Sequence, residues 1–147
     1  MEFSVRRATG ADTTSIQRLY IELVGADANI NVDPEFVTSL ENDPSNYLIV
    51  AESAAKILGT AFITICRDVM YTNQPFALVE NIVVTSSARS KGIGKALMAK
   101  VKAICKEQKC TKIMLLSNAN RTEAHKFFEQ NGYRGDLKRG FVNYINR

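Results

Sequence analysis

Long hydrophobic runs are absent from this sequence. No stretch approaches the roughly 20 apolar residues that a membrane-spanning helix needs, and residues 1–7 lack the apolar centre of a secretory signal peptide. We therefore expect a cytoplasmic protein. Blocks of like charge are also absent, while 46% of the residues are hydrophobic, so an ordinary globular protein is expected. A chain of 147 residues suits one domain with its own core.

Cysteine and histidine are scarce. The three cysteines, Cys66, Cys105 and Cys110, are an odd number without the spacing of metal ligands. The single histidine, His125, has no second ligand near it in the sequence. This pattern favours free thiols in a reducing compartment, and it predicts no metal site.

Strong net charge is missing as well. The net charge is +4, and the basic residues are scattered, with a concentration between residues 89 and 112. A nucleic-acid-binding surface would give a similar pattern, but no recognition motif accompanies it. Positive charge beside the start of a helix is more simply explained by a polyanionic cofactor.

The segment from residue 78 to residue 103 changes its hydrophobic period once. It begins with an apolar, β-branched run that predicts a buried strand: Leu78, Val79, Ile82, Val83 and Val84. After the loop at residues 85–94, the apolar residues follow the spacing of one helix face: Ile93, Ala96, Leu97, Val101, Ile104 and Cys105. The segment therefore predicts a strand, a glycine loop and a helix over residues 92–108.

That arrangement is suited to binding an anion. The first turn of a helix carries unpaired N–H groups and the positive end of the helix dipole. Gly92 and Gly94 allow a phosphate to approach the backbone, and Arg89, Lys91 and Lys95 add positive charge. A diphosphate would fit. The spacing matches neither a Walker loop nor a three-glycine dinucleotide fingerprint.

The pattern Arg89-x-x-Gly92-x-Gly94 resembles the signature of the GNAT superfamily of N-acetyltransferases. A second block at residues 112–133 is similar to the family's downstream block, so the resemblance covers most of the chain. An ordinary glycine turn at a helix start is the alternative. The resemblance implies that the loop holds the pyrophosphate of acetyl-CoA through Arg89, Ser90, Lys91, Gly92, Ile93, Gly94 and Lys95.

The expected fold is α/β in three layers. Strands are predicted near residues 3–7, 47–52, 57–67, 76–84, 112–117 and 141–145, and helices near 16–24, 34–43, 92–108 and 120–131. This gives a single domain over residues 1–147 with about four helices and a mixed, mostly antiparallel sheet of six to seven strands. The resemblance implies a splayed central parallel pair, with the pantetheine arm of the cofactor pairing with Ile82, Val83 and Val84.

The acceptor site is implied by the resemblance alone. In the family, the first two helices and their connection overlie it. The segments expected to contact the acceptor, residues 25–35, 68–75 and 134–140, carry no motif that identifies a substrate.

Glu80 is the candidate general base. It interrupts an apolar strand at its centre and has the same strand parity as Ile82 and Val84, so an unpaired carboxylate there would be costly unless it faced a cleft or a partner. Many members of the family keep a glutamate on this strand. The alternative is that Glu80 pairs with a lysine or arginine in a purely structural role. His125 is a weaker candidate for the base.

The downstream block departs from the family pattern twice. Asn120 is predicted to cap the last helix, with Glu123 completing a capping box. Phe128 stands where the family usually has the tyrosine that protonates the leaving thiolate, so that proton must come from water or from another residue. Arg121 replaces an asparagine that commonly contacts the cofactor; it either reaches a phosphate or has no role.

These observations together predict an enzyme that transfers acetyl from acetyl-CoA to the primary amine of a small molecule, by direct attack in a ternary complex. Segments 77–84, 112–117, 124–128 and 138–142 are most similar to the branch that includes aminoalkylphosphonate acetyltransferases. The alternatives are a protein or peptide N-acetyltransferase and a non-catalytic acyl-CoA-binding sensor. A homodimer is common in such families.

Overall fold

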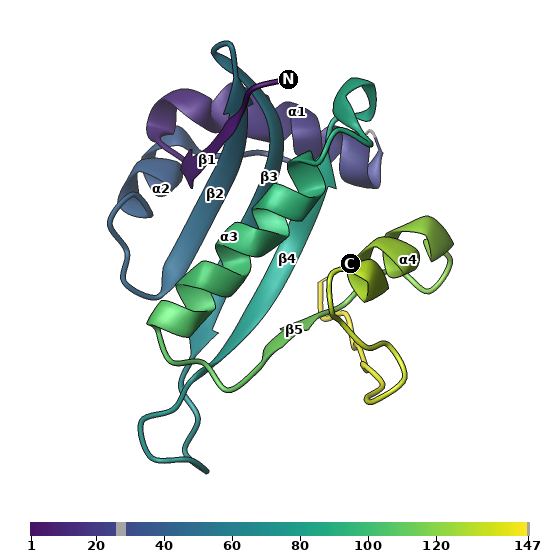
Figure 1. Ribbon diagram of the computed structural model, residues 1–147. Coiled ribbons are helices and arrows are strands. Elements are labelled where there is room, and N and C mark those ends of the chain that lie inside the picture. The colour runs from purple at the N-terminus through teal and green to yellow at the C-terminus, as the bar shows by residue number, and fades with distance from the viewer. Residues whose placement is uncertain (26–28, 147) are drawn as a thin grey trace. The chain divides into compact units, whose positions relative to one another are not determined.

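The computed structural model describes residues 1–25 and 29–146, and these form two compact units, one up to residue 115 and the other from residue 116 onward (Figure 1). The first unit holds five strands and three α-helices among its described residues, and the second holds one α-helix. In chain order the elements are β1 Ser4–Arg7, the 3₁₀ turn η1 Gly10–Asp12, α1 Thr13–Val24, α2 Pro34–Ser39, β2 Asn46–Ser53, β3 Lys56–Cys66, β4 Phe76–Val84, the 3₁₀ turn η2 Ser86–Ala88, α3 Ile93–Glu107, β5 Ile113–Leu115 and α4 Thr122–Gln130.

The sheet follows the chain order β1-β2-β3-β4-β5. Neighbouring strands from β1 to β4 are antiparallel: η1, α1 and α2 connect β1 to β2, and shorter turns or loops join β2, β3 and β4. Strands β4 and β5 are parallel, and α3 makes the crossover between them. The β2–β3 hairpin turns at Ala54 and Ala55, both with positive φ, as a two-residue hairpin of the favoured twist requires. The predicted mixed, mostly antiparallel sheet is therefore confirmed.

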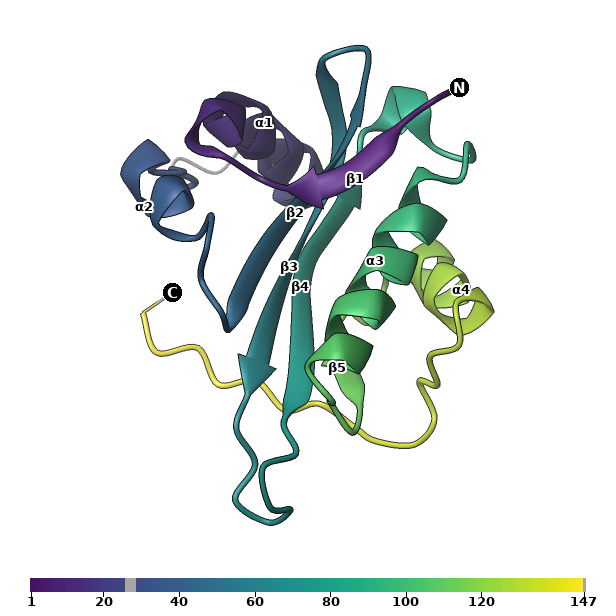
Figure 2. The ribbon, with the colours of Figure 1, turned by 60° about the vertical axis from the view of Figure 1, so that its left-hand side comes forward.

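Helices cover both faces of this sheet (Figure 2). On one face, α3 contributes the apolar stripe that the sequence periodicity predicts, and the central strands supply its partners: Ile49, Ala51, Ala61, Ile63, Ala77, Val79, Ile93, Leu97, Val101, Ile104 and Cys105. On the other face, α1 and α2 pack onto β2 around Ala8, Ile16, Val37, Leu40, Leu48 and Val50. The sheet is thus the middle of three layers, which confirms the α/β fold class.

The helix ends also follow local chemistry. Gly25 ends α1 with φ +88°, and the Asp33 carboxylate accepts a hydrogen bond of 3.0 Å from the Glu35 N–H at the start of α2. Pro34 occupies the first turn, where its missing N–H costs nothing. Both boundaries were predicted from the sequence.

The predicted number of strands is wrong. The described residues form five strands, not six to seven, and no strand forms at residues 141–145. A strand needs a neighbouring strand to accept its hydrogen bonds, and the large side chains of this segment, such as Phe141 at 86% and Ile145 at 83% exposure, are not buried. The strand predicted at 112–117 is also shorter, running from Ile113 to Leu115.

A β-bulge interrupts the pairing of β3 with β4. Phe62 pairs with Glu80 but Thr60 pairs with Val83, so β4 has one residue more than β3 between these pairs. Asn81 takes up the extra residue with φ +54°. The bulge reverses the face of the sheet to which each later side chain of β4 points. Glu80 and Ile82 therefore lie on different faces.

Candidate functional site

The loop between β4 and α3 has the backbone of an anion site. Ser90 has φ +63°, and Gly92 has φ +86° as the N-cap residue of α3. Because glycine has no side chain, it leaves the first-turn N–H groups of α3 uncapped. Ile93 is buried in the core at 1% exposure and anchors the helix start. The N–H groups and the positive end of the helix dipole therefore point out of the protein at a fixed position.

The space around this loop suits a polyanion. A Cβ atom built on Gly92 would have no other atom within 4 Å, so the backbone there is open to a ligand. The side chains of Arg89, Lys91 and Lys95 are exposed around it. A diphosphate would fit these residues, because main-chain N–H donors and three exposed cationic side chains can share its charge.

A carboxylate from α1 holds the start of the same loop. Glu22 accepts a hydrogen bond of 2.7 Å from the Thr85 hydroxyl and one of 3.0 Å from the Ser86 N–H. The Thr85 and Ser86 hydrogen bonds hold the pKa of Glu22 below its usual range. From the other side, Arg89 Nε donates to the Val84 carbonyl at 3.1 Å. Glu22 was not predicted from the sequence, because more than 60 residues separate it from its partners and no local signal marks it.

The strand edge predicted to meet the pantetheine arm is in β4. The parallel ladder with β5 joins Ala77 to Val79 with Ile113 to Leu115. Within the described part of the first unit, it does not continue to Ile82, Val83 and Val84. Main-chain groups on that side of β4 therefore have no strand partner within the unit, as an amide-bearing ligand would require.

Glu80 is exposed, and its predicted strand parity is wrong. Because of the bulge at Asn81, Glu80 lies opposite Phe62 on the face that carries α1 and α2, whereas Ile82 and Val84 pack with the core beneath α3. An exposed carboxylate has no burial cost to offset. Among the described residues, Glu80 forms no salt bridge, so no structural ion pair explains it.

Tyr20 of α1 lies next to this position. Burial raises the pKa of Tyr20 to about 12, although a hydrogen bond with the Asn81 side chain lowers it. This contact ties α1 to the bulge, one residue from Glu80. Sequence analysis assigned Tyr20 only to a helix face and gave Asn81 no role, since neither a bulge nor a positive φ is marked by an asparagine alone.

The second unit contains the other predicted cofactor residues, Asn120, Arg121 and Phe128. Helix α4 starts one residue later than predicted: Arg121 occupies the N-cap position, and Asn120 lies before it. No side-chain hydrogen bond caps this helix, so the predicted capping box is wrong. Asn120 and Arg121 are both exposed. His125 Nε2 lies 2.9 Å from the Asn118 carbonyl, which gives it a local structural contact.

Phe128 belongs to an aromatic group within this unit. Its ring meets Phe127 edge-on at 5.5 Å and Tyr133 at 6.3 Å between centroids. The Tyr133 N–H donates to the Phe128 carbonyl at 3.0 Å, which closes the helix end at Gly132. Phe128 is only half-buried, so part of its ring remains open.

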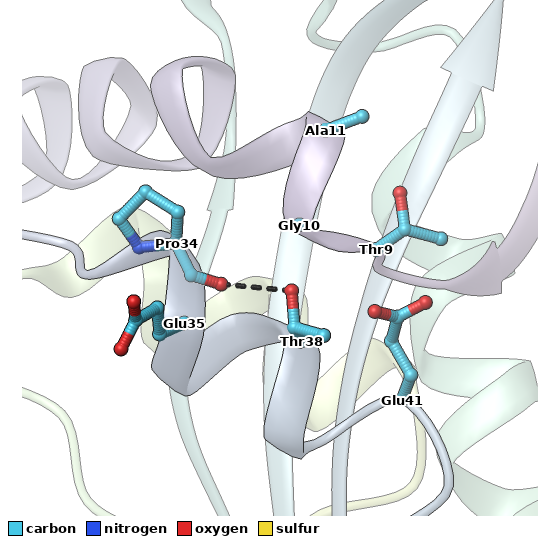
Figure 3. A pocket seen from close by; sticks show the side chains of 7 residues that line it. All are labelled: Thr9, Gly10, Ala11, Pro34, Glu35, Thr38 and Glu41. Carbon is cyan, nitrogen blue, oxygen red and sulfur yellow. Dashed lines mark hydrogen bonds between the residues drawn. The ribbon is translucent and has the colours of Figure 1, made fainter.

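A surface depression of about 570 Å³ lies on the opposite face of the sheet from α3, between η1 and α2 (Figure 3). It is lined by Thr9, Gly10, Ala11, Pro34, Glu35, Thr38 and Glu41, and the Thr38 hydroxyl donates to the Pro34 carbonyl beside it. The predicted base and cofactor residues do not line this depression, whereas Pro34 and Glu35 belong to the segment 25–35 that was predicted to contact the acceptor. The glycine loop is instead an open surface, as binding a flexible phosphate chain allows.

The three-layer architecture, the crossover helix α3 and the uncapped glycine loop at its N-terminus define the class of this molecule as an α/β protein with a mixed sheet. The chain belongs to the acetyltransferase (GNAT) family, whose family model matches residues 14–133. The matched range includes β4, the glycine loop, α3 and α4.

Known structures show the same fold. A protein from Agrobacterium tumefaciens str. C58, assigned as an acetyltransferase, has a TM-score of 0.87 at 24% identity, over 97% of this chain and 99% of that chain. An aminoglycoside acetyltransferase from an uncultured soil metagenomic sample has a TM-score of 0.84 at 19% identity, over 99% and 97%. The uncharacterized protein YxbD of Bacillus subtilis is 36% identical over 66 residues, which cover 45% of this chain and 40% of that relative.

None of the helices in the described residues combines the length and the apolar character that crossing a lipid bilayer requires. Cys66, Cys105 and Cys110 are free thiols.

Proposed function

We propose that this protein is an N-acetyltransferase that acetylates the primary amine of a small molecule by direct attack in a ternary complex. Acetyl-CoA supplies the acetyl group as a thioester, and the products are an amide and free CoA. The observation that carries the proposal is the open glycine loop at the N-terminus of α3 in a chain of the GNAT family.

The loop would bind the cofactor by its diphosphate. The main-chain N–H groups at Ser90, Gly92, Ile93 and Gly94 supply fixed donors, and Arg89, Lys91 and Lys95 supply charge. The edge of β4 at Ile82, Val83 and Val84, which has no strand partner within the first unit, would align the pantetheine arm. In the second unit, Asn120, Arg121 and the exposed part of the Phe128 ring are the candidate contacts.

Glu80 is the proposed general base. An amine attacks only when it is neutral, so its proton must leave before or during attack. The Glu80 carboxylate accepts that proton directly or through one water. It is exposed, so solvent reaches it and carries the proton away. Phe128 has no proton to donate to the departing thiolate, which therefore takes one from water.

The acceptor is proposed to be a small amine, as in the branch of aminoalkylphosphonate acetyltransferases. The structural likeness to an aminoglycoside acetyltransferase is consistent with this, although at 19% identity it extends only to the fold. A protein or peptide N-terminus is the second candidate acceptor. A non-catalytic acyl-CoA sensor is the third candidate function, favoured by the missing hydroxyl at Phe128. Three free thiols accord with a cytoplasmic location.

The test is acetyl-CoA-dependent thiol release with small amines, aminoalkylphosphonates, aminoglycosides, polyamines and peptide N-termini, with calorimetric CoA binding alongside. We expect turnover on one class of amine. CoA binding without turnover across the panel would favour the sensor, and the absence of CoA binding would refute the assignment of the loop.

Replacing the proposed base gives a sharper prediction. Glu80→Gln should lower kcat/KM about 10²-fold or more near pH 7, with a smaller loss at pH 9, where more of the amine is already neutral. CoA affinity should not change. Glu107→Gln, an exposed carboxamide substitution on α3, is the matched control and should match the wild type. Equal rates for Glu80→Gln and wild type at every pH from 6 to 9 would eliminate Glu80 as the base.

A further inference from the structure

Both carboxylate oxygens of Glu22 are used at one turn. One oxygen accepts from the Thr85 hydroxyl at 2.7 Å, and the other accepts from the Ser86 N–H at 3.0 Å. Thr85 immediately follows β4, and Ser86 opens the 3₁₀ turn η2. Thr85 gives η2 no side-chain cap. Glu22 therefore supplies, from a different helix, the cap that this turn lacks locally.

The turn is held from a second direction by the loop itself. Arg89 Nε donates to the Val84 carbonyl at 3.1 Å, folding the end of η2 back onto the end of β4. The backbone N–H of Thr85 also donates to the Leu58 carbonyl of β3 at 2.8 Å. These contacts hold the chain segment that joins the β4 edge to the glycine loop. The position of the glycine loop relative to the β4 edge therefore depends on these hydrogen bonds.

The charge of Glu22 makes a direct ligand role unfavourable. The carboxylate reaches from α1 to the start of the connection that carries Arg89, Lys91 and Lys95, and its negative charge would repel an anionic ligand there. A carboxylate beside an anion site lowers the affinity for the anion, unless the hydrogen bonds by which it orders the loop stabilise the complex by more than the charge repulsion destabilises it. Coulombic attraction to Arg89 also acts on Glu22, which keeps that charge partly compensated.

We infer that Glu22 is a positioning residue for the diphosphate loop: its carboxylate holds Thr85 and Ser86 so that the β4 edge and the N-terminus of α3 bind one cofactor together. This inference rests on the proposed function. Glu22 also lies close in the chain to the proposed acceptor site, because α1 ends at Val24 and is followed from Gly25 by the segment predicted to contact the acceptor.

The test compares Glu22→Ala, Glu22→Gln and Thr85→Val by calorimetric binding of CoA and by KM for acetyl-CoA. The loss of two hydrogen bonds to an exposed carboxylate should weaken CoA binding about five- to tenfold, with kcat changed less than about twofold. Glu22→Gln keeps one acceptor oxygen and should fall between Glu22→Ala and wild type. Thr85→Val keeps the charge and should weaken binding as well. The CoA affinity of the double variant Glu22→Ala/Thr85→Val should fall by less than the product of the two single fold-losses, because both changes remove the same hydrogen bond.

Pantetheine, which lacks the diphosphate, separates positioning of the loop from general damage. Its inhibition constant against acetyl-CoA should stay within about twofold of wild type in all three variants. In the free protein, amide hydrogen exchange at residues 86–95 should be faster in Glu22→Ala and unchanged in the control Glu107→Ala.

Tighter CoA binding by Glu22→Ala and Glu22→Gln would show that charge repulsion dominates, and it would overturn the inference. So would unchanged CoA affinity together with unchanged exchange in the loop. Wild-type protein that fails to bind CoA would instead refute the proposed function, and this result is distinguishable because it requires no variant. Equal losses for CoA and pantetheine would show a global defect and would also reject the positioning role.

Discussion

Single backbone angles decide the chemistry of this site at the scale of the residue. Gly92 adopts φ +86° and so turns the chain into α3 with its N–H groups open. Asn81 adopts φ +54° and so places Glu80 and Ile82 on different faces of the sheet. The effect of Asn81 extends beyond the residue itself, because the side chains of a strand alternate between faces and one extra residue reverses that alternation.

Gly92→Ala should damage both the fold and the loop. A left-handed φ costs an L-residue roughly 1–2 kcal/mol relative to glycine, and the new methyl group would stand in the space where a diphosphate is proposed. We expect CoA affinity to fall at least about tenfold, with a loss of unfolding free energy of about 1 kcal/mol. Calorimetry and urea unfolding measure the two effects.

Gly25→Ala is the control for strain alone. Gly25 has φ +88° and, like Gly92, has no atom within 4 Å of a built Cβ. It ends α1 and is not among the proposed phosphate contacts, so its substitution should cost stability while leaving CoA affinity within about twofold of wild type. If Gly92→Ala bound CoA as tightly as Gly25→Ala, the backbone at Gly92 would not be a phosphate contact.

At the scale of the element, the junction of β1 with η1 is held by a polar network. Arg6 donates to both carboxylate oxygens of Asp12, at 2.8 and 3.0 Å, and to Glu52 at 2.9 Å. The Thr9 N–H donates to Asp12 at 2.7 Å. Burial of Asp12 by itself raises its pKa, but the Arg6 and Thr9 hydrogen bonds outweigh burial, so the pKa of this carboxyl lies below its usual value of 3.8.

This depressed pKa gives the stability a defined dependence on pH. Below pH 3.8 the unfolded chain binds a proton at Asp12 that the folded chain resists, so stability rises with pH through this window. The contribution is complete above the usual carboxyl pKa and is lost as pH falls through the folded value. Asp12→Asn should therefore cost about 1–2 kcal/mol at pH 7 and much less at pH 2.5, as measured by urea unfolding.

Glu129→Gln provides a reference for this series, since Glu129 is exposed on α4. It should leave the free energy of unfolding unchanged at both pH values. An equal cost of Asp12→Asn at pH 7 and pH 2.5 would contradict the role given to the ionised carboxylate.

Sequence patterns predicted most elements because the causes of those elements are local. The apolar stripe of α3, Pro34 behind Asp33, and Gly25 at the end of α1 all act within a few residues. The cap at Asn120 was wrong because the side chain of a good capping residue still has to reach the N–H of the turn, and α4 begins after Arg121. The strand at residues 141–145 was wrong because pairing requires a neighbour that propensity alone does not supply.

At the scale of the whole molecule, the chain forms two compact units, and large apolar side chains are exposed in the second. Leu116, Leu137 and Val142 are each more than 60% exposed, and Phe141 and Ile145 more than 80%. Exposed apolar groups of this size favour association with another surface. We therefore propose that these side chains are buried in a homodimer, as the sequence analysis expected.

Light scattering during size exclusion should show a dimer at micromolar concentration. Replacing two exposed apolar residues in the double variant Phe141→Glu/Ile145→Glu should shift the protein toward monomer, because burying two unpaired carboxylates in an interface is costly. The control Lys138→Glu, an exposed change of charge in the same segment, should leave the mass unchanged. A wild-type monomer at every concentration would reject the dimer.

The sequence by itself determined the fold class, the family and the glycine loop, because each depends on hydrophobic period and on residues adjacent in the chain. Only the tertiary structure decided the face on which Glu80 lies, the extent of the β4–β5 ladder and the partnership of Glu22 with Thr85 and Ser86. The reason is physical. A bulge, the end of a ladder and a contact across more than 60 residues are set by which strands and helices meet, and no local pattern of side chains specifies that meeting.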